Sequence, residues 1–266
     1  MILFVPLAIL ITFILLYLPI PVALGWTAFL SLFFIGGSTL PLLGKGSFEY
    51  LNNFSYNAVL FFIIMGAIMT RGASARRLIN FANVLTGFFP GGLAISAVLA
   101  CFLFGAISGS AIATLVAIGS IMVPAMVERK YSRDFSVGLL TSSAELGILV
   151  PPSIPMIILA ITIDISVGRL FLAGYLPALV FTLSYSIYLF IHARKAGILR
   201  EKFPPHREIW TKFKESLWAL LLILIIAGGI YGGIFTANEA ASVGTVYAIL
   251  LELLIYRSMS FRQMGR

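Results

Sequence analysis

Long apolar segments alternate along the chain with short polar connectors, a pattern that predicts several membrane-spanning helices. Pro19-Ile-Pro21 separates the first two segments, and a polar connector, residues 38–57, precedes the third. The N-terminus lacks a basic region and a cleavage site, so we expect the first segment to be a retained span. The segments interpreted as spans or parts of spans are residues 2–18, 22–37, 58–70, 93–126, 135–165, 169–193, 216–235 and 240–256.

The segment 93–126 is interrupted at its centre by Ser108-Gly109-Ser110. Glycine costs roughly 1 kcal/mol relative to alanine inside a helix, and non-helical backbone at membrane depth persists only where protein or a polar cavity surrounds it. The two arms contain 15 and 16 residues, so each reaches roughly 22–24 Å, less than the ~30 Å hydrocarbon core. These lengths favour a re-entrant helical hairpin with its tip at the break. Two short spans are the alternative.

A second break is predicted at Pro151-Pro152-Ser153, inside the segment 135–165. Proline lacks an N–H donor and clashes with the preceding helical turn, so two in a row should unwind the helix. Two broken helices that face each other at mid-membrane are typical of secondary-transporter sites, because free N–H groups suit a carboxylate and free C=O groups suit a cation. The alternative interpretation is that Gly105 and Gly109 form a GxxxG packing face.

Glu145 is the acidic residue deepest in an apolar segment, and Thr141-Ser142-Ser143-Ala144 precedes it. An intramembrane carboxylate is a functional candidate. The same carboxyl group could instead bond to serines or helix ends and brace the hairpin, and the sequence leaves both roles open. Asp164 lies near a span end, where a solvated side chain is expected.

Residues 71–92 are predicted to form an interfacial amphipathic helix that ends at Pro90-Gly91-Gly92. One face is polar and the opposite face is apolar. The polar face contains Arg76, Asn80 and Asn83, and the apolar face contains Leu78, Phe81, Ala82, Leu85 and Phe88.

The last two spans carry two smaller signals. Gly228-Gly229 and Gly232-Gly233 have the small-xxx-small spacing that predicts close helix packing. Glu239 is expected to cap the helix that starts near Ala240.

Composition and charge fit an all-α polytopic membrane protein. Hydrophobic residues make up 60% of the chain and charged residues 11%, against about 25% charge in a soluble domain. With the N-terminus outside and residues 93–126 entering and leaving on one side, 16 of the 18 basic residues fall inside, and Lys45 and Arg169 stay outside. The net charge of +8 therefore reflects topology and predicts no nucleic-acid partner.

Enzyme classes find little support in the sequence. His192 and His206 lie at or beyond span ends, so a buried Ser–His dyad is not expected. Motifs of the HExxH and GxxxxGK[ST] types are absent from the sequence. The single cysteine, Cys101, is expected to be a small core residue. We expect a non-enzyme without a cofactor.

Three motifs resemble the large membrane subunit, the DctM type, of the tripartite ATP-independent periplasmic (TRAP) transporters. Residues 105–126 are similar to the family's first hairpin, and residues 147–156 to its discontinuous helix. Residues 229–241 resemble its Gly-Gly-Ile-Phe-Thr-Pro-Thr-Glu-Ala-Ala signature, except that Ala237 and Asn238 replace the usual Pro and Thr.

The resemblance implies a sodium-coupled importer of organic anions, such as C4-dicarboxylates, in the bacterial or archaeal cytoplasmic (inner) membrane. It also implies an elevator-type motion and three kinds of partner: a small permease subunit, a periplasmic solute-binding protein and membrane lipid. Na⁺ is expected at Ser108, Gly109, Ser110 and Pro151. The candidate substrate- and ion-binding residues are Ser108, Gly109, Ser110, Thr114, Ser142, Ser143, Glu145, Pro151, Pro152 and Ser153.

The resemblance also implies a division of labour along the chain. Residues 1–70 would be scaffold spans, 71–92 the interfacial helix, 93–165 the transport repeat, and 166–266 scaffold spans with a basic cytoplasmic loop at 194–215. The family's subunit is longer and contains a second, inverted hairpin and broken helix. The chain thus resembles the first half of an inverted-repeat transporter of the ion-transporter type. A truncated or non-transporting scaffold is the alternative.

Overall fold

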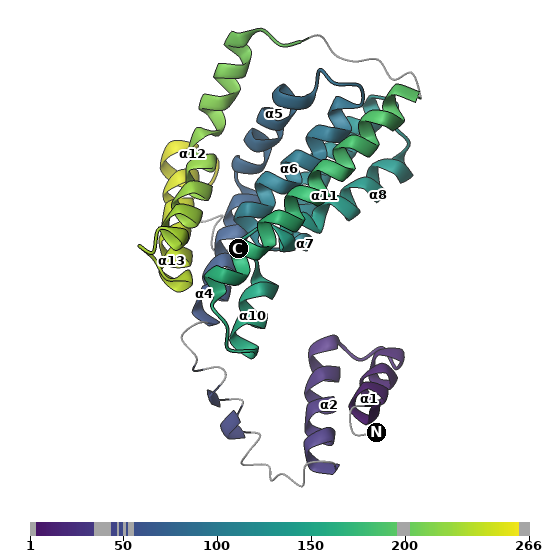
Figure 1. Cartoon of the computed structure of the whole chain (residues 1–266), viewed down its shortest axis with the longest axis vertical. Coiled ribbons are helices and arrows are strands. Elements are labelled where there is room, and N and C mark those ends of the chain that lie inside the picture. The colour runs from purple at the N-terminus through teal and green to yellow at the C-terminus, as the bar shows by residue number, and fades with distance from the viewer. Residues whose placement is uncertain are drawn as a thin grey trace. The chain divides into compact units, whose positions relative to one another are not determined.

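A computed structural model describes residues 4–34, 44–46, 48–49, 52, 56–195 and 203–260 (Figure 1). The described residues form helices, turns and irregular connections, without strands. The chain divides into two compact units, Met1–Asn53 and Phe54–Arg266. Each unit is described by itself.

The first unit contains two short apolar helices, α1 (Phe4–Leu15) and α2 (Ile20–Phe34), that pack against each other. The chain leaves helical geometry between them at the predicted proline break. Among the residues of α2 whose side chains are described, Ala23 and Thr27 are buried. The predicted end of the second span, residues 35–37, and most of the polar connector 38–57 lie outside the described residues.

The second unit is a helical bundle. α13 continues directly into a π-helical turn, η1. The helices are α4 (Tyr56–Arg71), α5 (Ser74–Thr86), α6 (Gly92–Ser108), α7 (Ala111–Glu128), α8 (Arg133–Ala144), α9 (Leu146–Leu149), α10 (Ile154–Thr162), α11 (Val167–Lys195), α12 (His206–Tyr231), α13 (Ala237–Leu250) and η1 (Leu251–Ile255).

Within the described residues, four helices are long and apolar enough to cross a membrane: α7, α11, α12, and α13 with η1. Two bent pairs raise the number to six if each pair is one span. α4 and α5 meet at 70°, and the α8–α9 segment meets α10 at 44°. The all-α polytopic prediction is confirmed, as is the discontinuous helix at Pro151-Pro152.

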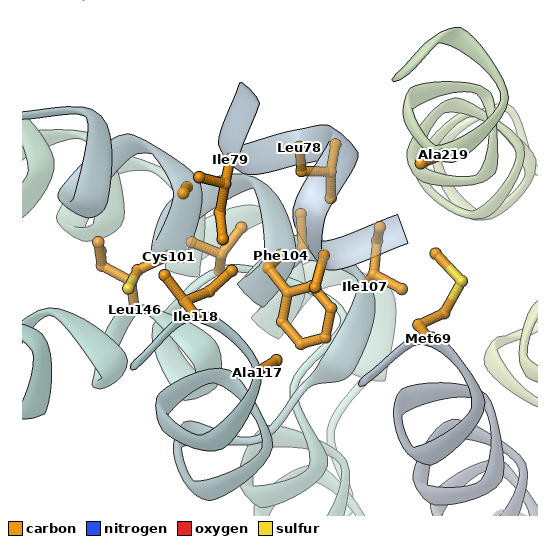
Figure 2. Close-up of a cluster of buried hydrophobic side chains, with 14 of the residues drawn as sticks. Met69, Leu78, Ile79, Cys101, Phe104, Ile107, Ala117, Ile118, Leu146 and Ala219 are labelled. Atoms are coloured by element: carbon orange, nitrogen blue, oxygen red, sulfur yellow. The ribbon is translucent and has the colours of Figure 1, made fainter. Parts of the chain in front are cut away.

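α6 lies at the centre of the bundle and contacts α4, α5, α7, α8, α9 and α11. Its Ala97, Ala100 and Cys101 are fully buried, which fits close packing through small side chains. Figure 2 shows Phe104 in the middle of the core, with Ile118 from α7 and Leu78 from α5 around it. The expectation that Cys101 is a core residue is confirmed.

The amphipathic helix exists as α5, but its buried stripe differs from the predicted one. The buried residues are Ser74, Ala75, Leu78, Ile79, Ala82 and Val84. Leu85, assigned to the apolar face, is 38% exposed, whereas Ile79 is buried. The stripe follows the protein neighbours of α5, which are mainly α6 and α12, and helical spacing alone does not identify those neighbours.

Two predictions near the C-terminal spans are wrong. Residues 206–215 belong to α12 rather than to a loop, because helical contacts such as the Lys212–Glu215 pair and the Trp210–Phe213 stack accommodate their charged and aromatic side chains. Among the described residues, the glycine pattern at 228–229 and 232–233 brings no second helix close. A Cβ at Gly228 would meet nothing within 4 Å, and Gly232 is the C-cap of α12. The expected cap by Glu239 is confirmed, since Thr236 and Glu239 form a capping box on α13.

Candidate ion and substrate site

The predicted hairpin is formed by α6 and α7, which pack against each other across a two-residue connection. Gly109 adopts a left-handed conformation (φ 62°), and its N–H donates to the Gly105 carbonyl at 3.2 Å. Ser110 then caps α7 by accepting a hydrogen bond from the Ala113 N–H at 3.3 Å. A left-handed C-cap followed by a serine N-cap reverses the chain tightly.

The hairpin arms are longer than the sequence predicts. α6 has 17 residues and α7 has 18, so they extend roughly 26 and 27 Å. α6 extends by one residue at each end, from Gly92 to Ser108, and α7 continues to Glu128. The observed arms come closer to the ~30 Å thickness of the hydrocarbon core than the predicted arms do. Their length is therefore weaker support for a re-entrant hairpin over two full crossings of the membrane.

The second break lies between α9 and α10, where residues 150–153 are not helical. Ser153 is fully buried and makes bonds on both sides of the break. Its hydroxyl donates to the Ile148 carbonyl at 2.6 Å and accepts from the Met156 N–H at 3.4 Å. Ser153 thus holds the two half-helices in a fixed relation.

The two breaks lie directly against each other. The Ile154 N–H, at the start of α10, donates to the Gly109 carbonyl at the hairpin tip at 3.2 Å. A Cβ on Gly109 would lie 2.8 Å from the Pro152 carbonyl oxygen, and one on Gly105 would lie 2.9 Å from that of Leu146. Both separations are too short for a side chain. The approach of the two broken segments therefore requires glycine, so the packing role predicted for Gly105 and Gly109 coexists with their position at the candidate site.

A pair of buried hydroxyl groups lies where the hairpin tip meets the second break, a place called the crossing below. The Ser108 and Thr114 hydroxyls are 2.9 Å apart, and both residues are almost fully buried. Ser108 also donates to the Ser110 carbonyl at 3.3 Å. The crossing is thus rich in neutral oxygen atoms, which are the donors that hard cations prefer. The N-termini of α7 and α10, which begin just after the two breaks, carry the partial positive charge that suits an anion.

The remaining predicted residues differ in how far they are buried within the protein. Pro151 and Pro152 are buried with Ser153 in the break. Ser143 is fully buried on α8, and its hydroxyl has no hydrogen-bond partner among the described residues. Ser142 is half-buried.

Glu145 lies between α8 and α9 and is exposed, as is Asp164. The structure gives the Glu145 carboxylate no hydrogen bond within the described residues, so it does not support the bracing role. Ion or substrate binding by Glu145 stays a prediction.

Three glycines near the crossing were not predicted. A Cβ on Gly147 would lie 2.5 Å from the Thr114 hydroxyl and 2.6 Å from the Ser110 carbonyl oxygen. Gly66 on α4 lies against Ser108, and Gly174 on α11 lies against the Leu149 carbonyl. Isolated glycines inside apolar helices are the only signal in the sequence, and the signal does not say which neighbour is close.

Residues 7–266 match the family described as "Tripartite ATP-independent periplasmic transporter, DctM component". The chain belongs to the DctM family of TRAP transporter large permeases. It is 41% identical over 242 residues to the C4-dicarboxylate TRAP transporter large permease protein DctM of Vibrio cholerae, covering 91% of this chain and 53% of the relative.

Other relatives of the DctM family carry different substrate names. The ectoine TRAP transporter large permease protein TeaC of Halomonas elongata is 45% identical over 202 residues, covering 76% of this chain and 47% of the relative. The isethionate TRAP transporter permease protein DctMQ of Oleidesulfovibrio alaskensis is 34% identical over 247 residues, covering 91% of this chain and 38% of the relative. The chain spans about half the length of the first two relatives.

Proposed function

We propose that this chain forms one repeat of a Na⁺-coupled permease that imports organic anions by an elevator-type motion. Membership of the DctM family and the multi-pass helical fold support transport. The observation that carries the site is the contact between the two breaks, where the Ile154 N–H bonds to the Gly109 carbonyl. Half-helix ends that meet in this way are a recurrent design of ion-coupled transporter sites.

In this proposal Na⁺ binds to neutral oxygen atoms at the tip and at the facing break. Ser108 and Ser110 offer hydroxyl oxygens, and Gly109 and Pro151 offer carbonyls. Ser143 has a buried hydroxyl that finds no partner in the part of the chain that the structure describes, and it lies three residues before Leu146, whose carbonyl lies against Gly105. An orphaned buried hydroxyl costs free energy, which a bound ion nearby would offset.

An anionic group of the substrate would bind at the N-termini of α7 and α10. The relatives are named for C4-dicarboxylates, ectoine and isethionate, and each of these compounds carries a carboxylate or a sulfonate. A helix N-terminus recognises such a group through N–H donors without a fixed cationic side chain. C4-dicarboxylates are the substrate class that we propose to test first.

The partners and location follow the same proposal. A periplasmic binding protein would deliver the substrate, and a small permease subunit would complete the complex in the cytoplasmic membrane of a bacterium or archaeon. The predicted orientation, with the basic connectors inside, is compatible with this location.

The test is uptake of a labelled C4-dicarboxylate by the complete permease with its binding protein, in Na⁺ or in K⁺ at equal ionic strength. Ser110→Ala removes the tip hydroxyl, and Ser120→Ala is the control because Ser120 is exposed on the same helix. We expect uptake by the parent to require Na⁺. We expect the half-saturating Na⁺ concentration to rise about tenfold in Ser110→Ala, because the variant loses one polar contact to a charged species, worth about 1.4 kcal/mol. We expect no change in Ser120→Ala.

An unchanged Na⁺ dependence in Ser110→Ala would contradict the site assignment. Absence of uptake by a correctly assembled parent would contradict the transport proposal and favour a non-transporting scaffold.

A further inference from the structure

A buried carboxylate on the last described helical segment caps a helix that begins far away in the sequence. Glu252 lies in η1 and is fully buried. One carboxylate oxygen accepts from the Ala73 N–H at 2.9 Å, and the other accepts from the Ser74 N–H at 3.1 Å. The hydroxyls of Ser74 and Ser258 donate to the same carboxylate. Four donors thus bind one buried anion.

Three of the four donors, the two N–H groups and the Ser74 hydroxyl, belong to the corner between α4 and α5. The two helices meet there at 70°, and α5 has no side-chain cap from its own N-cap residue, Ala73. A carboxylate at a helix N-terminus bonds to free N–H groups and interacts favourably with the helix dipole. Glu252 therefore serves as the cap that the local sequence of α5 lacks.

Gly72 shows how closely the Glu252 side chain packs against the corner between α4 and α5. A Cβ on Gly72 would lie 2.1 Å from the Glu252 carboxyl carbon, so the carboxylate occupies the space that a side chain would need. The π-helical geometry of η1 is itself unusual, because π-helical turns are rare and recur at functional positions.

A second set of contacts ties the next turn of α5 to the same region. The Arg77 guanidinium lies 3.9 Å from the centre of the Tyr256 ring and donates to the Glu215 carbonyl of α12 at 3.1 Å. The Tyr256 hydroxyl donates to the same carbonyl at 3.0 Å.

We infer that Glu252 is a positioning residue, which anchors the first turn of α5 to the helix pair α12–α13 while α5 leads the chain into the α6–α7 hairpin. α5 lies between α6 and α12 (Figure 1). Its first turn, at Ser74, is anchored on the side of the proposed scaffold. Its last turn, at Thr86, leads to α6 in the proposed moving repeat. This role rests on the proposed function. In this proposal Glu252 is not a ligand of the ion or of the substrate. It holds the first turn of α5 in place while the hairpin unit moves.

The first arm of the test does not depend on transport. Amide hydrogen exchange of residues 72–77 is measured in the complete permease for the parent, Glu252→Gln and the milder Ser74→Ala. Glu239→Gln is the matched control, because Glu239 also caps a helix N-terminus but is exposed and lies within its own helix. We expect exchange at 72–77 to rise about tenfold in Glu252→Gln, less in Ser74→Ala, and not at all in Glu239→Gln.

The second arm measures uptake by the same variants. If Glu252 is a positioning residue, the maximal uptake rate should fall about fivefold in Glu252→Gln. The half-saturating substrate and Na⁺ concentrations should stay unchanged. Unchanged exchange at 72–77 would overturn the anchor. Faster exchange with an unchanged maximal rate would overturn its role in transport. Failure of the parent to transport would contradict the proposed function, and the exchange arm would still decide the anchor.

Discussion

At the residue scale, the contact between the two broken segments depends on glycines that leave no room for a side chain. Gly147 is the sharpest case, because a Cβ there would meet the Thr114 hydroxyl at 2.5 Å and the Ser110 carbonyl at 2.6 Å. Backbone and buried hydroxyl groups at this distance cannot move aside without separating the hairpin tip from the break. The glycine is therefore part of the site although it carries no polar side chain.

Gly147→Ala is expected to destabilise the protein by about 1–3 kcal/mol, the usual cost of overpacking a tight interior. Gly138→Ala is the matched control on α8, because a Cβ there meets nothing within 4 Å, and alanine is the better helix former. Thermal unfolding in detergent or nanodiscs measures both. Equal melting temperatures for Gly147→Ala and the parent would show that the two broken segments are not in close contact.

Sequence reasoning identifies the residues of the site better than their environments. Ser108, Ser110 and Ser153 stand out because a polar residue beside glycine or proline in an apolar run is unusual. The exposed position of Glu145 could not be predicted, since it depends on which way the short α9 segment turns. The cap provided by Glu252 could not be predicted either, because the two N–H groups that it caps lie 178 and 179 positions away in the sequence.

At the element scale, strong apolar runs and proline breaks predict where helices lie, and polar helix ends are where the prediction fails. The hairpin, the broken helix and α11 appear close to their expected bounds. α12 begins at His206, because an amphipathic, charged turn can continue an apolar helix beyond the membrane core. Hydropathy detects the apolar part and misses the polar extension.

The C-terminal turn of α12 offers an element-scale prediction. Phe235 folds back over Gly229, where a Cβ would lie 2.3 Å from the ring, and the Gly229 carbonyl accepts the N–H groups of Ile234 and Phe235. We expect Gly229→Ala to lower the melting temperature by displacing this ring, and the adjacent Gly228→Ala to leave it unchanged or raise it slightly. A similar decrease in both variants would show that the cost lies in the helix rather than in the Phe235 contact.

At the scale of the whole molecule, the central claim is that the hairpin tip and the facing break form an ion site. The family match places the chain among TRAP transporter large permeases. A residue beside the tip that is not a proposed ligand gives the most direct report. Ala111 is suitable, because it is half-buried in the first turn of α7.

The decisive measurement is the rate at which a maleimide alkylates Ala111→Cys in a Cys101→Ala background of the complete permease, in Na⁺ and in K⁺ at equal ionic strength. Ser120→Cys, exposed on the same helix, is the control for general effects of the two cations. The account predicts that Na⁺ slows alkylation at position 111 severalfold and leaves position 120 unchanged, because a bound ion stabilises the closed contact between tip and break. Equal rates at position 111 in the two cations would contradict the account.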